Sequence, residues 1–439
     1  YSVESKTKGF REGALPGEEY VEAGRDMAES EKAVKYLQDA GYDMLNCDNG
    51  TYDAWYWAHP PIYMPENCNL EDVEHIRKFV DIPVVCAGRM DPRVAADAIR
   101  DGRLDGAGFA RQFLADQEWV TKLMNGQEDN IRPCILCHNG CFNMCHYKGV
   151  PNDQALSDSL HLARCAVNAE TMQWEKHKLI KTASPKKVHI IGGGIGGMEA
   201  ARVLKLRGHE PVIHEKKGEL GGTFIAASAE SYKGKLRDLL TWYKKQMKDL
   251  DIEIHFNEEI RSLEPFAGSP VIVATGSVAR VLKKVPGHEK MVEACEYLTG
   301  TPVGEKVAVV GGGLTGCEIA YELALQGKKP VIVEMKDDLI AQTGVCLANS
   351  SYLREWFAWQ KVPVYLETTL QSVEDGRIIC KDKEGREITI PCDSVISSAG
   401  YLPNPLAEES RNVHLVGDCK QVGNLRSVVW RAYEVAMKI

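Results

Sequence analysis

Two short glycine-rich turns, each lying between an apolar strand and a helix, constrain this chain more than any other feature. The first turn follows Val188-His-Ile-Ile and has glycines at Gly192, Gly194 and Gly197. Such a turn lets backbone N–H groups at the start of a helix bind a pyrophosphate. The next strand ends at Glu215, whose carboxylate can accept hydrogen bonds from an adenosine ribose. The segment predicts a dinucleotide site, and a tight turn without a ligand is the alternative.

The second turn repeats this arrangement further along the chain. Lys306-Val-Ala-Val-Val leads into Gly311, Gly313 and Gly316, and the following strand ends at Glu334. A carboxylate at that position would repel the 2′-phosphate of NADP and accept a hydrogen bond from the 2′-hydroxyl of NAD. We therefore expect NADH here. Two copies in one chain favour two nucleotide sites over two turns that bind nothing.

Two further segments make the arrangement more specific. An apolar strand ends in Ala-Thr275-Gly276, and Val413-His-Leu-Val-Gly leads to Asp418. With the two turns, this order resembles the two-dinucleotide flavoprotein reductases, in which FAD occupies the first domain and NAD(P)H an inserted second one. The resemblance implies that Thr275, Gly276, Asp418 and Gly222 lie on the FAD. Taken alone, Asp418 could equally be the N-cap of a helix.

The cysteines are unevenly distributed. Of the 14 in the chain, nine are scattered in mostly apolar surroundings and are expected in the core. Cys134, Cys137 and Cys141 form a Cys-x2-Cys-x3-Cys pattern, and the fourth ligand is either Cys145 or Cys165. Thiolates at these spacings can bind a four-iron cluster, and zinc is the alternative. Because two dinucleotide sites accompany them, we favour a 4Fe-4S electron carrier.

The first part of the chain alternates short apolar strands with amphipathic helices. Ile82-Pro-Val-Val-Cys-Ala87 is a typical strand, and 29–40 and 92–101 read as helices that end near a glycine. Repeated strand–helix units predict a parallel sheet covered by helices. With four such strands, the sheet is either a small open one or the C-terminal half of an eight-stranded barrel.

The order of these parts gives a second resemblance. A barrel end, the cysteine motif, a later Cys165-Ala-Val-Asn168 and the FAD motif resemble the multidomain NADH:flavin oxidoreductases. These include 2,4-dienoyl-CoA reductase, 2-enoate reductase, trimethylamine dehydrogenase, and bile-acid and steroid 4-ene oxidoreductases. In that family the cysteine matching Cys165 is the fourth cluster ligand. The loop before it is longer here, which keeps Cys145 open, and its polar part, 148–162, is predicted to be a surface loop.

The resemblance implies an FMN-binding TIM barrel of the old yellow enzyme type at the N-terminal end. Gly88, Arg89, Ala110 and Arg111 match the positions that hold the FMN phosphate, at the carboxyl ends of the last two strands. An ion pair at the barrel rim is the alternative for Arg111. The chain starts inside a predicted strand, so we expect half of the barrel to be missing and FMN to be held weakly by this part alone.

An aromatic stretch follows one of the barrel strands. It runs from Gly50 to Tyr63 and could form a flat wall over the flavin or simply pack as a loop. Tyr52 aligns with a catalytic histidine of dienoyl-CoA reductase and is the candidate proton donor, with His59 as the alternative. The stretch resembles the 2-enoate and bile-acid/steroid branch of the family more than the dienoyl-CoA branch.

Charge and hydropathy exclude other classes of protein. Acidic residues outnumber basic ones, 62 to 53, giving a net charge of -9 over 439 residues. This balance disfavours a nucleic-acid or anionic-membrane partner. We find no apolar run long enough to span a bilayer and no signal-peptide pattern at the start. We therefore expect a cytoplasmic enzyme with a small-molecule substrate, and the sequence leaves homo-oligomerisation open.

These observations predict an α/β protein in four parts. They are half of a (β/α)8 TIM barrel in 1–125, a 4Fe-4S segment in 126–170, a Rossmann-like FAD domain in 186–285 and 389–439, and a Rossmann-like NAD(H) domain in 300–388. The resemblance implies an NADH-dependent ene-reductase that passes electrons through FAD, the cluster and FMN to the C=C bond of an enoate, enoyl-CoA or 4-ene-3-one, or the reverse desaturation. The alternatives are an amine dehydrogenase, an NADH:acceptor diaphorase and a non-catalytic zinc protein.

Overall fold

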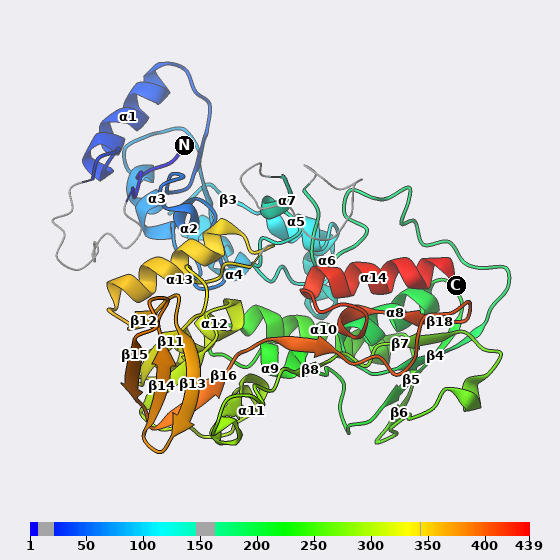
Figure 1. Ribbon diagram of the computed structural model, residues 1–439. Coiled ribbons are helices and arrows are strands. Elements are labelled where there is room, and N and C mark those ends of the chain that lie inside the picture. The colour runs from blue at the N-terminus through cyan, green and yellow to red at the C-terminus, as the bar shows by residue number, and fades with distance from the viewer. Residues whose placement is uncertain (8–21, 146–162, 343) are drawn as a thin grey trace. The chain divides into compact units, whose positions relative to one another are not determined.

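The computed structural model describes residues 1–7, 22–145, 163–342 and 344–439 (Figure 1). The predicted surface loop 148–162 lies outside the described residues. By their contacts the residues form two compact units. The first contains Tyr1–Phe113, Leu136–His138 and Val345–Pro363, and the second contains Leu114–Ile135, Asn139–Gly344 and Val364–Ile439.

The first unit is built on a three-stranded parallel sheet. Its strands are β1 (Leu45–Cys47), β2 (Val84–Ala87) and β3 (Gly106–Gly108), in the order β1-β2-β3. The helices of this part of the chain are α1 (Met27–Asp39), α2 (Trp55–Ala58), α3 (Leu70–Arg77), α4 (Pro92–Arg100) and α5 (Arg111–Ala115), with α13 (Leu347–Trp359) joining them from far along the sequence. The strand expected at the start of the chain is a single parallel bridge between Ser2 and Asp48.

Apolar side chains from the sheet and its helices form the core of the first unit. Val34 of α1, Val73 and Ile76 of α3, and Val84 and Cys86 of β2 are fully buried in it. The chain reverses direction between strand and helix through short caps. Asp91, for instance, accepts hydrogen bonds from the backbone of the first turn of α4, as an N-cap residue does. The alternation predicted from the sequence is confirmed for these elements.

The second unit contains two parallel sheets with the same design. The first is ordered β18-β7-β4-β5-β6, and all its neighbouring strands are parallel. Its strands are β4 (Lys187–Ile191), β5 (Glu210–Glu215), β6 (Glu253–Phe256), β7 (Val271–Val273) and β18 (Val413–Leu415). Helices α8 (Ile195–Leu206) and α14 (Leu425–Lys438) lie side by side, and α10 (Gly234–Asp249) also contacts α8 (Figure 1).

The second parallel sheet has the order β12-β11-β10-β16-β9, which is equivalent to that of the first sheet listed from its other edge, β6-β5-β4-β7-β18. Its strands are β9 (Val292–Glu293), β10 (Lys306–Val310), β11 (Lys329–Val333), β12 (Val364–Tyr365) and β16 (Ser394–Ser397), with helices α11 (Ala294–Leu298) and α12 (Leu314–Leu325). In both sheets the central strand leads into a glycine-rich turn and its neighbour leads to an acidic residue. Two Rossmann-like folds are therefore present, as the sequence predicts.

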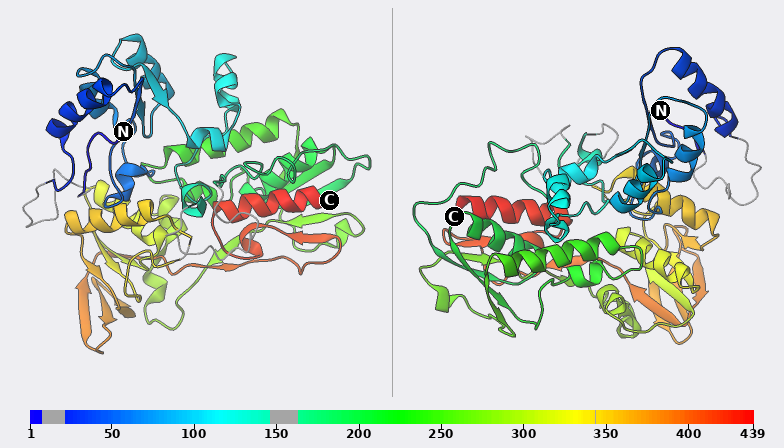
Figure 2. Two further views of the ribbon diagram at one scale, coloured as in Figure 1. Left: turned by 90° about the horizontal axis from the view of Figure 1, so that it is seen from above. Right: turned by 180° about the vertical axis from the view of Figure 1, so that it is seen from behind.

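Two antiparallel sheets complete the second unit. One consists of β13 (Thr369–Glu374), β14 (Arg377–Lys381) and β15 (Glu387–Pro391), shown in orange and brown in Figures 1 and 2. The other pairs β8 (Ser277–Ala279) with β17 (Tyr401–Pro403). The chain leaves the first nucleotide fold through β8 and returns to it through β17, so the second fold is an insertion. Short helices α6 (Trp119–Met124), α7 (Phe142–Cys145) and α9 (Phe224–Ala227) lie outside the sheets.

Seven of the nine scattered cysteines are buried, as expected for core residues; the other two, Cys68 and Cys295, are partly buried. Burial raises the pKa of Cys47 and of Cys380 to about 11, so these thiols stay protonated and unreactive at neutral pH. Within the described part of the chain, no helix is both long and apolar enough to cross a membrane.

Candidate cofactor-binding site

The first glycine-rich turn brings strand β4 and helix α8 closer together than any side chain would allow. Gly192 has φ +111°, and a Cβ there would lie 2.5 Å from the carbonyl oxygen of Ala274. A Cβ on Gly197, in the first turn of α8, would overlap the carbonyl oxygen of Gly192. These positions must be glycine because the helix packs directly on the end of the strand.

The start of α8 has room for an anion. Gly194 is its N-cap, and among the described residues no side chain caps the helix. A Cβ built on Gly194 would meet no atom within 4 Å, so the space in front of the helix is open. The first N–H groups and the positive end of the helix dipole point into this space. A pyrophosphate group fits these features.

Glu215 stands beside this turn at the end of β5. Its side chain is buried, with one carboxylate oxygen accepting from the backbone N–H of Gly193 at 2.7 Å and the other from Lys217 at 2.8 Å. Each carboxylate oxygen can accept a further hydrogen bond. Glu215 therefore holds the turn in shape and keeps the capacity to accept from ribose hydroxyls.

The other residues expected on the FAD side gather at the same edge of the sheet. Gly222 has φ +54°, and its Cβ position lies 3.2 Å from the Cα of Gly194. Thr275 and Gly276 follow β7, where the Thr275 hydroxyl donates to the carbonyl of Asn404 at 2.6 Å. The structure thus brings together Gly192, Gly194, Gly197, Glu215, Gly222, Thr275, Gly276 and, through its contact with Ser277, Asp418.

Asp418 is not a helix N-cap, which corrects the alternative reading of this residue. Helix α14 is capped by Asn424, whose side chain accepts from the backbone of Ser427. The Asp418 carboxylate instead accepts from the backbone of Gly423 at 3.1 Å and lies 3.4 Å from the hydroxyl of Ser277. Burial raises its pKa above the usual range. A half-buried carboxylate at the edge of the nucleotide sheet is suited to hydrogen-bonding a polar ligand.

The second glycine-rich turn has the same geometry as the first. Gly311 has φ +110°, and a Cβ on Gly316 would overlap its carbonyl oxygen. Glu334, only 8% exposed, accepts from the backbone N–H of Gly312 at 2.6 Å and of Lys336 at 2.8 Å. Its position matches that of Glu215. The 2′-phosphate of a nucleotide bound at this turn would have to approach the Glu334 carboxylate.

Gln342 distinguishes the second turn from the first. Its side-chain oxygen accepts from the backbone N–H of Leu314, the first residue of α12, at 3.1 Å. A Cβ on Gly313, the N-cap of this helix, would lie 2.9 Å from the same oxygen. The amide oxygen of Gln342 therefore occupies the position in front of the helix that is open in the first turn. The sequence motif gives no sign of this contact, because Gln342 is remote along the chain.

Two segments that carry candidate metal-binding cysteines contact each other within the second unit. A Cβ on Gly140, next to Cys141, would lie 2.6 Å from the carbonyl carbon of Cys165. The N–H of Arg164 also donates to the carbonyl of Gly140 at 2.7 Å. Cys165 is buried, and its carbonyl accepts from the Trp430 indole at 2.9 Å.

The remaining cysteines of the motif are divided between the units. Cys134 belongs to the second unit with Cys141 and Cys165, whereas Cys137 belongs to the first. The backbone of Cys145 ends α7, and its side chain lies outside the described part of the structure. Four thiols are a donor set suited to iron or zinc. The packing of Gly140 on Cys165 favours Cys165 over Cys145 as the fourth ligand.

In the first unit, the two arginines expected near a flavin phosphate bind one loop. Arg89, with φ +48°, donates from Nη1 to the carbonyls of Pro61 at 3.0 Å and Ile62 at 2.9 Å. Arg111 donates to the carbonyl of Pro60 at 2.9 Å and lies 2.6 Å from Nε2 of His138. Gly88 precedes Arg89, with φ +114°, and Ala110 precedes Arg111 at the start of α5.

His138 stays neutral beside Arg111. Burial and the neighbouring guanidinium hold its pKa well below the usual value. Its other ring nitrogen lies 3.1 Å from the side-chain oxygen of Asn349, which fits a proton on Nδ1 and an acceptor at Nε2. Among the described residues, Arg111 therefore contacts an acceptor nitrogen and a carbonyl, not a carboxylate, which differs from the ion pair considered as an alternative.

Both candidate proton donors lie on one aromatic stack. The rings of Tyr52 and Trp55 are stacked with centroids 4.6 Å apart, and the rings of Trp55 and His59 are 5.9 Å apart. Tyr52 is 64% exposed, so its hydroxyl is accessible. The centroids of Tyr52 and His59 are 6.4 Å apart, so the three rings form one cluster in which Trp55 is buried and Tyr52 is exposed.

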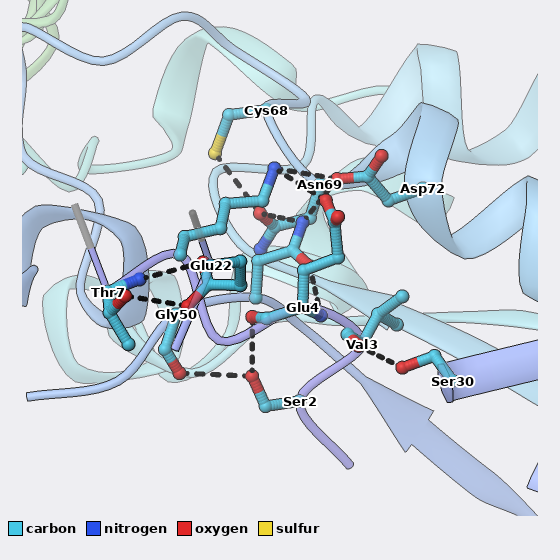
Figure 3. A network of polar contacts seen from close by, with 12 residues as sticks. Ser2, Val3, Glu4, Thr7, Glu22, Ser30, Gly50, Cys68, Asn69 and Asp72 are labelled. Atoms are coloured by element: carbon cyan, nitrogen blue, oxygen red, sulfur yellow. Dashed lines mark hydrogen bonds and ion pairs between the residues drawn. The ribbon is translucent and has the colours of Figure 1, made fainter. Parts of the chain in front are cut away.

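A buried polar network that sequence analysis missed lies at the carboxyl ends of β1 and β2 (Figure 3). The ammonium of Lys6 is 2.8 Å from Asp72, which also accepts from the Asn49 side chain at 2.7 Å. Asn69 joins the network by accepting from the Asn49 side chain at 3.2 Å, and it donates to the carbonyl of Ala87 at 2.9 Å. Barrel ligands bind at this end of the strands. The residues are distant in sequence, so no local pattern marks them.

Comparison with known proteins matches two parts of the chain to family models. Residues 186–420, more than half of the chain, match the pyridine nucleotide-disulphide oxidoreductase model. Residues 15–130 match the NADH:flavin oxidoreductase / NADH oxidase family. The chain therefore belongs to the pyridine nucleotide-disulphide oxidoreductases, and the order of its two matches resembles that of the multidomain NADH:flavin oxidoreductases. The multidomain family combines the two Rossmann-like folds with a TIM-barrel-like flavin fold.

Relatives of the whole chain agree with this assignment. It is 38% identical to a cinnamate reductase of Clostridium sporogenes over 100% of this chain and 65% of the relative. It is 30% identical to an NADH oxidase of Thermoanaerobacter brockii, covering 96% of this chain and 65% of that protein. The chain thus spans just under two thirds of the length of these relatives. A solved structure of 2-naphthoyl-CoA reductase has the same fold, with a TM-score of 0.82 at 24% identity over 95% of this chain and 64% of that one.

The contact made by Gln342 gives a testable prediction for this multidomain oxidoreductase. A nucleotide pyrophosphate entering the second turn must displace the Gln342 side chain from Leu314. Gln342→Ala removes that competitor, so we expect NAD⁺ to bind about fivefold more tightly, the equivalent of one hydrogen bond of about 1 kcal/mol. Calorimetric titration of the full-length protein with NAD⁺ measures this without turnover.

The matched control is Gln326→Ala, because Gln326 caps the opposite end of the same helix. Its affinity for NAD⁺ should equal that of the wild type. Unchanged or weaker NAD⁺ binding in Gln342→Ala would show that Gln342 does not compete for the pyrophosphate position.

Proposed function

We propose that this protein is an NADH-dependent ene-reductase that saturates the C=C bond of an α,β-unsaturated carboxylate, acyl-CoA or enone. The observation that carries the proposal is the duplicated turn with its two buried acids, Glu215 and Glu334, in one unit. One site holds FAD and the other NADH. The relative named cinnamate reductase, whose match covers the whole of this chain, supports an enoate as the substrate.

Each cofactor has a proposed set of residues. FAD is held by the first turn with Glu215 and Asp418, and NADH by the second turn with Glu334. The 4Fe-4S cluster is held by Cys134, Cys137, Cys141 and Cys165, and the FMN phosphate by Gly88, Arg89, Ala110 and Arg111. When bound, these groups supply hydride and single-electron transfer between NADH and the alkene.

The chain's own residues have three tasks in this reaction. The open start of α8 and the buried carboxylate of Glu215 bind and orient a nucleotide. Glu334 excludes a 2′-phosphate and so selects NADH over NADPH. The Tyr52 hydroxyl holds the proton that the α-carbon receives, while the buried, stacked ring of Trp55 positions the ring of Tyr52. In sum, NADH, a proton and the alkene give NAD⁺ and the saturated product.

A substrate screen on the full-length protein tests this function. After anaerobic reduction with one equivalent of NADH, we expect cinnamate or a 4-ene-3-one to reoxidise the flavin and yield the saturated product. The role of Tyr52 predicts that Tyr52→Phe lowers this turnover by about 100-fold, the usual contribution of a general acid. The control is Tyr42→Phe, since Tyr42 is also exposed in the first unit.

Other results would contradict the proposal. Reoxidation by dyes but by none of the alkenes would indicate a diaphorase, and flavin reduction by trimethylamine would indicate an amine dehydrogenase. Wild-type turnover in Tyr52→Phe would remove Tyr52 from the reaction; His59→Gln then tests the alternative donor.

The identity of the fourth cluster ligand gives a separate prediction. Because Gly140 packs on Cys165, we expect Cys165→Ser to lose most of its iron and acid-labile sulfide, while Cys145→Ser retains both. Elemental analysis and the absorption spectrum of the anaerobically purified protein measure this. Cys295→Ser serves as the control, since Cys295 lies elsewhere in the second unit.

The opposite pattern, with iron lost in Cys145→Ser and kept in Cys165→Ser, would assign the fourth position to Cys145. Zinc without iron or sulfide in the wild type would contradict the cluster altogether.

A further inference from the structure

Three histidines lie side by side across the first parallel sheet, away from any role in the proposed function. His189 is on β4, His214 on β5 and His255 on β6, and the register pairs His214 directly with His255. The rings of His189 and His214 are 5.3 Å apart, and those of His214 and His255 are 5.2 Å apart. Glu258 follows β6 and faces the same group.

Two imidazole nitrogens face one carboxylate oxygen. Oε2 of Glu258 lies 2.6 Å from Nδ1 of His214 and 3.4 Å from Nδ1 of His255. One ligand atom from each of the three residues lies within 4.8 Å of the others. A hydrogen bond from His214 to Glu258 explains the first contact, but it does not explain why a second imidazole turns the same nitrogen to the same oxygen.

The opposite ring nitrogens are already held by other partners. Nε2 of His214 is 3.0 Å from Nδ1 of His189, and Nε2 of His255 is 2.8 Å from the carboxylate of Glu253. Nδ1 of His189 is thus placed to accept a hydrogen bond from Nε2 of His214. Metal-binding histidines usually donate their second N–H to such an acceptor, which fixes the ring and frees the other nitrogen.

We propose that His214, His255 and Glu258 bind a divalent transition-metal ion, with Zn²⁺ as the best fit. Zinc takes imidazole and carboxylate ligands at about 2.0–2.2 Å, which separates neighbouring ligand atoms by about 3.4 Å. The 3.4 Å between Nδ1 of His255 and Oε2 of Glu258 already matches this value. The 2.6 Å between Nδ1 of His214 and the same oxygen must lengthen to it. Water takes the fourth position, because the side chains of His255 and Glu258 are 44% and 42% exposed.

The ion would lie next to the acid of the first glycine motif. His214 directly precedes Glu215, and the N–H of Glu258 donates to the carbonyl of Glu215 at 3.0 Å. The metal thus ties β6 and the residues after it to β5 at the point where the carboxylate of Glu215 is positioned.

Zinc titration of the full-length protein tests the site. The protein is purified without a histidine tag, keeps its flavins and iron–sulfur cluster, and is freed of loose metal with EDTA. Calorimetry with ZnCl₂ should show one site in the wild type that is at least about tenfold weaker in His255→Ala and in Glu258→Gln. Pulsed EPR of the Cu²⁺-loaded protein should detect two bound imidazoles in the wild type and one in His255→Ala.

The matched control is His288→Ala. His288 also lies near a carboxylate, 3.5 Å from Glu289, but just before β9 and outside the first parallel sheet, so zinc binding should be unchanged. Glu258→Gln keeps the size of the side chain, and its melting temperature in EDTA should equal that of the wild type. The proposal fails if the wild type binds no zinc at this stoichiometry, or if His255→Ala and Glu258→Gln bind it as tightly as the wild type.

Discussion

The close contact between a helix and the strand before it, repeated at two glycine-rich turns, is the constraint on which the second unit depends. At Gly197 and Gly316 any Cβ would overlap the carbonyl oxygen of the first glycine of its turn. This contact places the first N–H groups of α8 and α12 at the carboxyl ends of their sheets. The buried acids Glu215 and Glu334 then hydrogen-bond to the turns from the neighbouring strands. The same local packing thus fixes the position of both proposed nucleotide sites.

The two turns are alike in backbone and different in what lies before the helix. In front of α8 the space is open, whereas the amide oxygen of Gln342 occupies the start of α12. In the proposed function the first nucleotide stays bound and the second must enter and leave. The Gln342 side chain accepts a hydrogen bond from the start of the helix when no ligand is bound. This suits a site whose nucleotide leaves, because the N–H group then keeps a partner.

Much of the fold could be predicted from sequence because its signals are local. The strand, turn, helix and acid of each nucleotide fold lie within one short segment, and so do the strand–helix units near β2 and α4. What sequence could not show depends on residues that are distant along the chain. Lys6 meets Asp72, Gln342 meets Leu314, and His214 meets His255 only after folding. Asp418 was ambiguous for the same reason, since the true cap of α14, Asn424, is recognised by its hydrogen bond.

The central claim is that the first turn holds a flavin that NADH, bound at the second turn, reduces. Anaerobic titration of the full-length protein with NADH and with NADPH, followed by the flavin absorbance, tests it most directly. The account predicts that about one equivalent of NADH per reducible flavin bleaches the band, and that NADPH needs at least about tenfold more, because Glu334 opposes its 2′-phosphate. A protein purified without FAD, or one bleached equally by both nucleotides, would contradict it.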